Sequence, residues 1–471
     1  MLFGFDICLW SRSCYFLFVV DKIHKVTTVG MIGLGCPKNQ VDTERMLAHI
    51  AQSGLVISSD PERAEVVVIN TCGFIRPAID ESIDAIRWAM RLKMQGSAKK
   101  VIVCGCLAQR LGQGLFRKVK GIDALVGLSY RDQIAQIILQ TLSDTKKRTY
   151  LDDTARPLLL DDSIRVLVGP GHTAYLRLSE GCSHHCSFCT IPSIRGPHAS
   201  KPLKQVLQEA KHLVQAGVRE LIVIGQDITA YLKDQGIKDG LVRLIEGLDR
   251  LDGLAWARLM YLYPSGLTGT LIKAMAASSK VVHYVDLPIQ HVDDQILKAM
   301  RRPDTARSLR MLIEELKTTI PDMILRTTLI VGFPGETQAQ FESLLEFIRW
   351  ARFDALGCFP FYSEPGTPAA SLPGQVPSAT KRRRYDLVMK TQQQIALEKN
   401  LARIGSVLTC IVDQERSRRT RIGRFYGQAP QIDSNCLIRN CHAKPGTFVK
   451  AKVTDARPYE LVCDCVDQGT T

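Results

Sequence analysis

The stretch Glu180-Gly-Cys-Ser-His-His-Cys-Ser-Phe-Cys-Thr190 holds three cysteines, Cys182, Cys186 and Cys189, in one short loop. The loop comes directly after Ala174-Tyr-Leu-Arg-Leu-Ser179, an apolar run that predicts a buried strand. Thiolates select soft metals, but a structural zinc ion or an ordinary iron–sulfur cluster takes four protein ligands. With three local thiolates, the loop predicts a 4Fe-4S cluster in which one iron stays open and can chelate a small molecule.

Two plainer interpretations of this loop remain. His184 or His185 could complete a zinc site with the three cysteines. The cysteines could instead be inert buried thiols, although the Ser- and His-rich composition of the loop argues against an apolar environment. For the two histidines themselves, we expect positions that face solvent.

Upstream of the loop, apolar strands alternate with helices. The predicted strands cover residues 27–33, 65–69, 100–104 and 124–127, and helices are predicted at about 41–52 and 78–94. This alternation predicts a doubly wound α/β domain, in which helices cover both faces of a parallel sheet.

Three further cysteines, Cys36, Cys72 and Cys106, each follow the carboxyl end of a different predicted strand. Ligands bind at that edge of an open parallel sheet, so thiolates far apart in the sequence can converge there. The pattern predicts a second three-thiolate site, and the alternative is a chance recurrence of buried thiols. Cys104 lies inside a strand and is expected to be a core residue.

Downstream of residue 173, six strand-and-helix units can be counted. Their strands are predicted near residues 174–179, 219–224, 255–262, 281–287, 324–331 and 354–362. Six units are fewer than the eight of a closed barrel, so they predict an open, partial (β/α)6 barrel. The three-cysteine loop follows the first of these strands and is therefore expected at the C-terminal mouth of the barrel, where such folds hold their active sites.

From residue 405 the pattern changes to short alternating strands at 407–412, 419–424, 447–453 and 459–465. They predict a small antiparallel β-barrel. Before it, Lys381-Arg-Arg-Arg384 opens a predicted helix that ends near residue 403; this basic run is expected to be a solvated helix start, with contact to RNA phosphates as the alternative.

Composition and charge limit the class of protein. The chain has 471 residues, 61 Lys and Arg against 47 Asp and Glu, and a net charge of +14, which favours RNA or a ribonucleoprotein as a partner. Fifteen cysteines, an odd number, without a secretory signal indicate a reducing cytoplasm. The apolar run at 14–20 is too short to span a bilayer, so no membrane association is expected.

The expected organisation follows from these patterns. Residues 1–26 form an extension of uncertain status, 27–143 the N-terminal domain, 144–172 a linker, 173–400 the partial barrel with its following helix, and 401–468 the small β-barrel.

The C-x3-C-x2-C loop after a strand resembles the signature of the radical S-adenosylmethionine (SAM) enzymes. In that family the open iron binds SAM, and an electron from the cluster cleaves it to a carbon radical. The resemblance implies SAM contacts at two further strand ends, where glycines allow a ligand close to the backbone; each could equally be an ordinary turn. The expected contacts are Gly225, Gln226 and Asp227 after the second strand, and Gly332 and Glu336 after the fifth. Gln290 and His291, after the fourth strand, are similarly located.

The order of a three-cysteine α/β domain, a radical SAM barrel and a terminal β-barrel resembles the methylthiotransferases from residue 27 onward. The resemblance implies two 4Fe-4S clusters and SAM as cofactors. Cys36, Cys72 and Cys106 would hold the auxiliary cluster, and Cys182, Cys186 and Cys189 the SAM-binding one. It further implies that the terminal β-barrel is a TRAM domain.

The family has one branch that modifies adenosine 37 of transfer RNA and another that modifies the β-carbon of an aspartate in small-subunit ribosomal protein twelve. Leu34-Gly-Cys-Pro-Lys-Asn39, Asn70-Thr-Cys-Gly-Phe-Ile75 and Gly225-Gln-Asp227 resemble the protein-modifying branch. The resemblance therefore implies a cytoplasmic enzyme with that ribosomal protein as substrate, a reductant such as flavodoxin or ferredoxin, and RNA contact through the β-barrel.

The sequence departs from the pattern of this branch at Thr190, Ile228 and Leu232, where an aliphatic residue, Thr or Ser, and Gly are expected. None of the three is a predicted cluster ligand. A transfer-RNA methylthiotransferase remains the alternative function. A non-enzymatic iron–sulfur or zinc protein that senses redox state or binds RNA is a third, disfavoured by two separate triads of cysteines.

Overall fold

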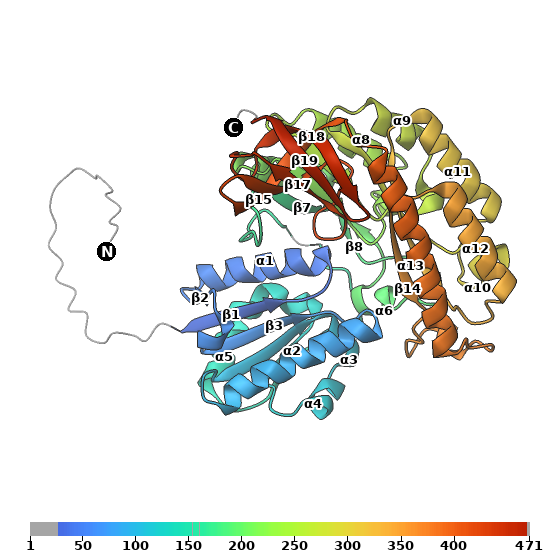
Figure 1. Ribbon diagram of the computed structural model, residues 1–471. Helices are drawn as coiled ribbons and strands as arrows, with labels where there is room; N and C mark the ends of the chain where they lie inside the picture. The colour runs from blue at the N-terminus through green and yellow to red at the C-terminus, as the bar shows by residue number, and fades with distance from the viewer. Residues whose placement is uncertain (1–26, 153, 160, 469–471) are drawn as a thin grey trace, which may run out of the picture.

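Three sheets organise the chain, each built from one continuous part of the sequence (Figure 1). The computed structural model describes residues 27–152, 154–159 and 161–468. The expectation for residues 1–26 lies outside the described residues.

The first sheet is parallel throughout and has the strand order β2-β1-β3-β4-β5-β6. Its strands are β1 (Thr28–Gly33), β2 (Val56–Ser58), β3 (Val66–Thr71), β4 (Lys100–Gly105), β5 (Ala124–Val126) and β6 (Arg148–Tyr150). The order reverses between β1 and β3, and the crevice at such a reversal is where open α/β sheets bind ligands. Strand β6 lies within the stretch expected to be a linker, so that stretch contributes an edge strand to the sheet.

Helices cover both faces of this sheet, which confirms the predicted doubly wound domain. One apolar cluster joins α2 (Arg76–Met94) and α4 (Gly114–Lys118) to one face, and a second joins α1 (Pro37–Gln52) and α5 (Ile134–Ser143) to the other. Cys104 lies in the second cluster with no exposed surface, as predicted for a core residue. A short helix, α3 (Cys106–Leu111), and a 3-10 segment, η2 (Leu128–Gln133), complete the domain.

The second sheet is the predicted open barrel of six parallel strands, in the order β14-β13-β12-β11-β10-β7. Its strands are β7 (Thr173–Arg177), β10 (Glu220–Ile224), β11 (Trp256–Leu259), β12 (Val281–Gln290), β13 (Ile324–Val331) and β14 (Ala355–Pro360). The helices of this part are α6 (Ile191–Arg195), α7 (Leu203–Gln215), α8 (Gly240–Asp249), α9 (Gly269–Ala277), α10 (Asp294–Ala299), α11 (Ala306–Thr319), α12 (Gln338–Ala351) and α13 (Ser378–Leu401). A large apolar cluster joins the sheet to these helices.

Two very short strands, β8 (Ser179–Glu180) and β9 (Ala199–Ser200), pair antiparallel on either side of the three-cysteine loop. The sequence pattern did not predict this pairing. It joins the two ends of the loop to each other, so the loop is closed at its base.

The third sheet is a closed barrel in the order β15-β16-β17-β19-β18, which confirms the predicted small β-barrel. Its strands are β15 (Val407–Ser417), β16 (Thr420–Phe425), β17 (Asn435–Arg439), β18 (Phe448–Arg457) and β19 (Glu460–Asp467). Neighbouring strands of this barrel pair antiparallel, as expected, except β17 and β19, which pair parallel. Strand β17, which the sequence pattern missed, runs beside β19 because the chain crosses the barrel through β18 between them.

The β-barrel packs on the inner face of the open barrel, and the two form one apolar cluster. Tyr175, Ile222 and Tyr284 of the open barrel share this cluster with Cys410 and Phe425 of the β-barrel. Val41 of α1 also belongs to it. In Figure 1 the helix α1 accordingly lies between the first sheet and the rest of the molecule, close to β7.

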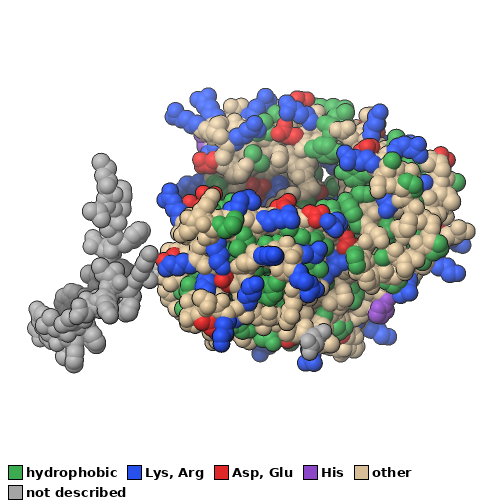
Figure 2. All heavy atoms as spheres, turned by 90° about the horizontal axis from the view of Figure 1, so that it is seen from below, with side chains coloured by type: hydrophobic (Ala, Val, Ile, Leu, Met, Phe, Trp, Pro, Cys, Tyr) green, Lys and Arg blue, Asp and Glu red, His purple; other side chains and the backbone are tan. Residues whose placement is uncertain are grey.

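The molecule is hollowed on the face seen in Figure 2, and Lys, Arg, Asp and Glu side chains line the rim of the hollow. Across residues 27–152, 154–159 and 161–468, the helices are all too short or too polar to cross a bilayer.

Candidate active site between the first two domains

Cys36, Cys72 and Cys106, here called the N-terminal thiols, follow β1, β3 and β4 at the same edge of the first sheet. Their loops are in contact. A Cβ added to Gly35 would lie 3.2 Å from the Cys72 Sγ, and one added to Gly73 would lie 2.9 Å from the Cys106 backbone. Glycine at these two positions therefore lets the three loops approach one another.

Cys182, Cys186 and Cys189, here called the loop thiols, follow β8 at the mouth of the open barrel. The loop is shaped by its own backbone, since the Cys182 N–H donates to the Gly196 carbonyl at 3.0 Å and the Cys189 N–H to the Cys186 carbonyl at 3.1 Å. Gly181 opens the loop with a φ of +73°, and a Cβ there would overlap the Pro197 carbonyl oxygen. Only glycine fits this turn.

Each donor set consists of three soft thiols. Among the described residues no group of three or more His, Cys, Asp or Glu side chains is arranged to hold one metal ion. Burial is the main cause that raises the pKa of Cys72 and of Cys189 to about 12, and neighbouring thiols of the same set add to it. Thiols of this kind release their protons when they bind a metal. Within the described residues each set offers three such ligands, the number that leaves one iron of a 4Fe-4S cluster open.

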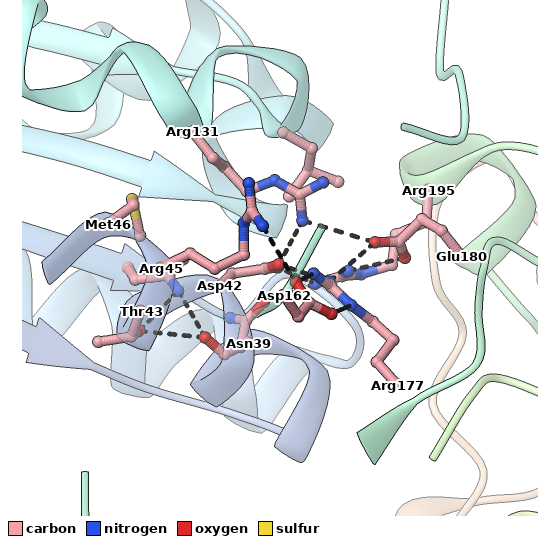
Figure 3. Close-up of polar contacts among 12 residues, drawn as sticks. Asn39, Asp42, Thr43, Arg45, Met46, Arg131, Asp162, Arg177, Glu180 and Arg195 are labelled. Atoms are coloured by element: carbon pink, nitrogen blue, oxygen red, sulfur yellow. Dashed lines mark hydrogen bonds and ion pairs between the residues drawn. The ribbon is translucent and has the colours of Figure 1, made fainter. Parts of the chain in front are cut away.

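A buried network of charges lies at the interface between the first two domains, and Figure 3 shows its contacts. The interface network consists of Asp42 on α1, Arg131 on η2, Asp162, Arg177 on β7, Glu180 on β8 and Arg195 on α6. Each of these side chains is at most 4% exposed. The network comes from the first domain, the connecting segment and the open barrel, so it fixes the two cysteine sites relative to each other.

Arg195 lies at the centre of this arrangement. Its guanidinium donates to Glu180 at 2.8 Å, to Asn39 at 2.7 Å and to Asp42 at 3.1 Å. The same group lies 3.4 Å from the Cys106 Sγ. Arg195 lies on α6, the helix that follows the loop thiols in the chain, so this helix reaches an N-terminal thiol.

The arginines decide the ionisation of the carboxyls around them. Burial alone would raise the pKa of Asp42, yet Arg131, Arg177 and Arg195 outweigh burial and hold that pKa well below its ordinary range. The pKa of Glu180 is likewise lowered, because the charges of Arg195, Arg177 and Arg131 outweigh the effect of burial. The network is therefore a set of full charges in a dry interface.

His184 of the cysteine loop is half-buried, contrary to the expectation that it faces solvent. Its Nε2 lies 2.8 Å from Asp227, and its ring stacks on Tyr263 with a centroid distance of 3.8 Å. The Arg302 guanidinium also lies over the Tyr263 ring, 4.2 Å from the ring centroid. Since His184 is engaged with Asp227, its participation in a zinc site has no support here. His185 is exposed, as expected.

The five predicted SAM contacts fall into two groups that differ in character. Gly225, Gln226 and Asp227 lie beside the loop thiols: Gln226 donates to Glu180 at 3.1 Å, and the Gln226 Oε1 is buried without a hydrogen-bond partner among the described residues. Gln226 thus has an acceptor still available for a ligand.

Gly332 and Glu336 form a self-contained turn after β13. Glu336 accepts from the N–H groups of Gly332 and Phe333 and pairs with Arg384 at 3.2 Å. A Cβ at Gly332 would overlap the side chain of Lys381 on α13. The basic run at the start of α13 is therefore partly used inside the protein, because Lys381 and Arg384 hold this turn rather than facing solvent.

The departures from the family pattern have local explanations. Thr190 donates from its Oγ1 to the Phe74 carbonyl at 3.2 Å and so ties the cysteine loop to the first domain. Ile228 is buried in the barrel core. Leu232 has a φ of +64°, a conformation that suits glycine best, and its N–H donates to Ser200 at 2.8 Å.

Sequence reasoning missed the interface network and Lys38. Lys38, Asp42 and Arg45 recur at helical spacing along α1, a pattern that normally marks a solvated face. The signal that could have revealed them is the position of α1, which directly follows a predicted cluster ligand and must therefore lie at the edge where ligands bind.

Comparison with family models divides the chain in the same way. Residues 28–127 match the Uncharacterized protein family UPF0004, residues 176–348 the Radical SAM superfamily and residues 404–466 the TRAM domain.

Among solved structures, the radical S-adenosylmethionine methyltransferase TsrM from Kitasatospora setae, with cobalamin and a [4Fe-4S] cluster bound, has a TM-score of 0.52. It is 14% identical, and the match covers 73% of this chain and 77% of that chain. This likeness concerns the fold.

Curated relatives match almost the whole chain. The ribosomal protein uS12 methylthiotransferase RimO of Geobacter sulfurreducens is 42% identical over 441 residues, and that of Trichlorobacter lovleyi 40% over 442 residues. Both matches cover 93% of this chain and 98% of the relative. RimO of Bdellovibrio bacteriovorus is 40% identical over 451 residues. With the three domains in the same order and two sets of three cysteines at one interface, the chain belongs to the RimO family of radical SAM methylthiotransferases.

Proposed function

We propose that this protein adds a methylthio group to the β-carbon of an aspartate in ribosomal protein uS12, with SAM and two 4Fe-4S clusters as cofactors. The observation that carries the proposal is the contact of Arg195 with Cys106: the helix that follows the loop thiols reaches an N-terminal thiol at 3.4 Å. Two cluster sites this closely joined suit a reaction in which hydrogen removal and sulfur delivery occur at one carbon atom.

The residues divide the work. When bound, SAM and the two clusters supply radical hydrogen abstraction and methylthio delivery, chemistry that no side chain of the protein offers. Cys182, Cys186 and Cys189 hold one cluster and leave an iron open to SAM, while Cys36, Cys72 and Cys106 hold the other. Gln226 and Asp227 would orient SAM; in support, Gln226 donates to Glu180 and Asp227 pairs with His184 of the cysteine loop. The interface network keeps the distance between the two sites constant, which is the main requirement for a reaction between two bound partners.

The names of the relatives favour uS12 over transfer RNA as the substrate. The match to the TRAM domain and the positive net charge support contact with ribosomal RNA around that protein. We further propose a cytoplasmic location, and flavodoxin or ferredoxin as the electron donor, since radical SAM chemistry consumes a low-potential electron.

The test compares the two cysteine sets. After anaerobic reconstitution, a Cys36→Ala/Cys72→Ala/Cys106→Ala variant and a Cys182→Ala/Cys186→Ala/Cys189→Ala variant should each hold half the iron of the wild type. Mass spectrometry of a uS12 peptide should show a methylthio group with the wild type and none with either variant. A Cys104→Ala variant is the control and should keep both clusters. A methylthio group on transfer-RNA adenosine, with the peptide unchanged, would replace the proposed substrate.

A further inference from the structure

Lys38 is a buried cation at the interface between the first two domains. It lies in the first turn of α1, two residues after Cys36, and is only 7% exposed. Its Nζ lies 3.5 Å from the centroid of the Tyr261 ring. Within the part of the chain that the structure describes, no carboxylate forms an ion pair with this ammonium and no oxygen accepts a hydrogen bond from it.

The other buried cations here are all paired. Arg131, Arg177 and Arg195 share Asp42 and Glu180, as described above. Burial lowers the pKa of Lys38, and of the groups that raise it the Cys36 thiol comes first, before the carboxylates of Asp286 and Glu180. Both are already bonded, because Arg326 donates to Asp286 at 2.8 Å and Arg195 to Glu180 at 2.8 Å.

A buried ammonium without a counter-ion is destabilising, and proteins seldom retain one unless a ligand pairs with it. The cation–π contact with Tyr261 offsets only part of that cost. Lys38 is thus a cation whose partner is missing from the chain itself.

The position of Lys38 limits which group can bind its ammonium. Tyr261 follows β11, and its N–H donates to Asp286 of β12 at 3.2 Å. Lys38 therefore lies beside the carboxyl end of β11 and near Asp286 in the middle of β12, while its own helix begins at an N-terminal thiol. A group bound there is between the mouth of the barrel and the N-terminal thiols, where the reacting side chain has to be.

We infer that Lys38 binds the carboxylate of the substrate aspartate and thereby selects aspartate over uncharged side chains. The inference rests on the proposed function. The carboxylate carbon is bonded directly to the β-carbon, so fixing the carboxylate at one end and the peptide backbone at the other leaves the β-carbon almost no freedom. Lys38 acts as a positioning residue, and Tyr261 holds its side chain in place before the substrate arrives.

A competing role for Lys38 would be to balance the negative charge of a cluster at Cys36. The two roles differ in what they do to substrates. A counter-charge for the cluster would affect every substrate equally and would alter cluster content, whereas a carboxylate-binding lysine discriminates between aspartate and asparagine and leaves the cluster intact.

The test uses two fluorescent uS12 peptides that differ only in Asp or Asn at the modified position. Binding to the cluster-loaded enzyme with SAM is measured by anaerobic fluorescence anisotropy for the wild type, Lys38→Gln, Lys38→Arg and the control Lys99→Gln, which changes an exposed lysine on the first domain. Iron content and the rate of SAM cleavage without peptide are measured on the same samples.

We expect the wild type and Lys99→Gln to bind the Asp peptide at least tenfold more tightly than the Asn peptide, since a charge-assisted hydrogen bond is lost with asparagine. Lys38→Gln should bind both peptides alike, with iron content and peptide-free SAM cleavage within twofold of the wild type. Lys38→Arg should restore part of the preference.

Three outcomes overturn the inference. The first is a wild type that binds both peptides equally. The second is a Lys38→Gln variant that still binds the Asp peptide more tightly than the Asn peptide. The third is a Lys38→Gln variant that loses iron, or whose affinity for both peptides falls to the same extent. Each of these leaves the proposed function standing if the wild type methylthiolates the Asp peptide. A wild type that modifies neither peptide removes the proposed function and the inference together.

Discussion

Asp42 receives hydrogen bonds from Arg131, Arg177 and Arg195, which come from two different domains. Because these arginines hold its folded-state pKa below the value of about 4 for an unfolded Asp, the stability that it contributes is fully present above about pH 4. That contribution is lost as the pH falls from about 4 toward the folded-state pKa.

An Asp42→Asn variant should therefore unfold at a lower temperature than the wild type at pH 7, by the equivalent of about 3–5 kcal/mol, because it leaves buried arginines without a carboxylate. The difference should narrow below pH 4. Thermal unfolding from pH 7 to 3 measures it, and Asp84→Asn, which changes an exposed pair, should match the wild type throughout. A difference in unfolding temperature that stays constant down to pH 3 would show that the ionised Asp42 carboxylate does not provide this stability.

Single residues also mark the limit of what the sequence predicts about the site. The six cysteines could be selected, because their position after strands is a local pattern. Arg195 and Lys38 could not, since an isolated basic residue looks the same in a sequence whether it is solvated or buried, and their partners are distant along the chain.

At the scale of elements, the cysteine loop depends on the turn at Gly181. A Gly181→Ala variant should lose the cluster of the loop thiols, because its Cβ would meet the Pro197 carbonyl and force the loop away from β9. Iron content should fall to about half of the wild-type value while the other cluster remains.

The matched control is Gly217→Ala. Gly217 has a φ of +101° but open space around it, so alanine there should cost about 1–3 kcal/mol of backbone strain and keep all the iron. Full iron content in both variants would show that the turn does not set the geometry of the loop.

Most elements could be predicted from periodicity, and those that were missed have two physical causes. Strands β2, β6, β8 and β9 have two or three residues, too few to show alternation. Strand β17 is longer, but its parallel partner β19 comes after β18 in the chain, and pairing of that kind has no local signature. The predicted antiparallel barrel was wrong at that pair for the same reason.

At the scale of the whole molecule, Glu220 holds the β-barrel to the open barrel. It pairs with Arg258 at 2.9 Å and with Arg424 of β16 at 2.7 Å, and all three side chains are buried. A Glu220→Gln variant should destabilise the protein by about 3–5 kcal/mol, because Arg258 keeps no carboxylate partner.

Loss of this pairing should loosen the β-barrel first. Hydrogen exchange should accelerate across residues 407–467 in Glu220→Gln while residues 28–126 stay protected. Asp464→Asn, which breaks an exposed pair on the same β-barrel, should cost less than about 1 kcal/mol and leave exchange unchanged. Uniform acceleration in all three domains would mean that the molecule unfolds as one unit.

The charged face of α1 has a consequence for synthesis. A chain growing from its N-terminus completes α1 at residue 52, but Asp162, Arg177, Glu180 and Arg195 leave the ribosome much later. Until then the first domain exposes Lys38, Asp42 and Arg45 to water instead of an apolar surface. The nascent domain can therefore stay soluble while it waits for the barrel, and an interface that is dry in the finished protein begins as a hydrated one.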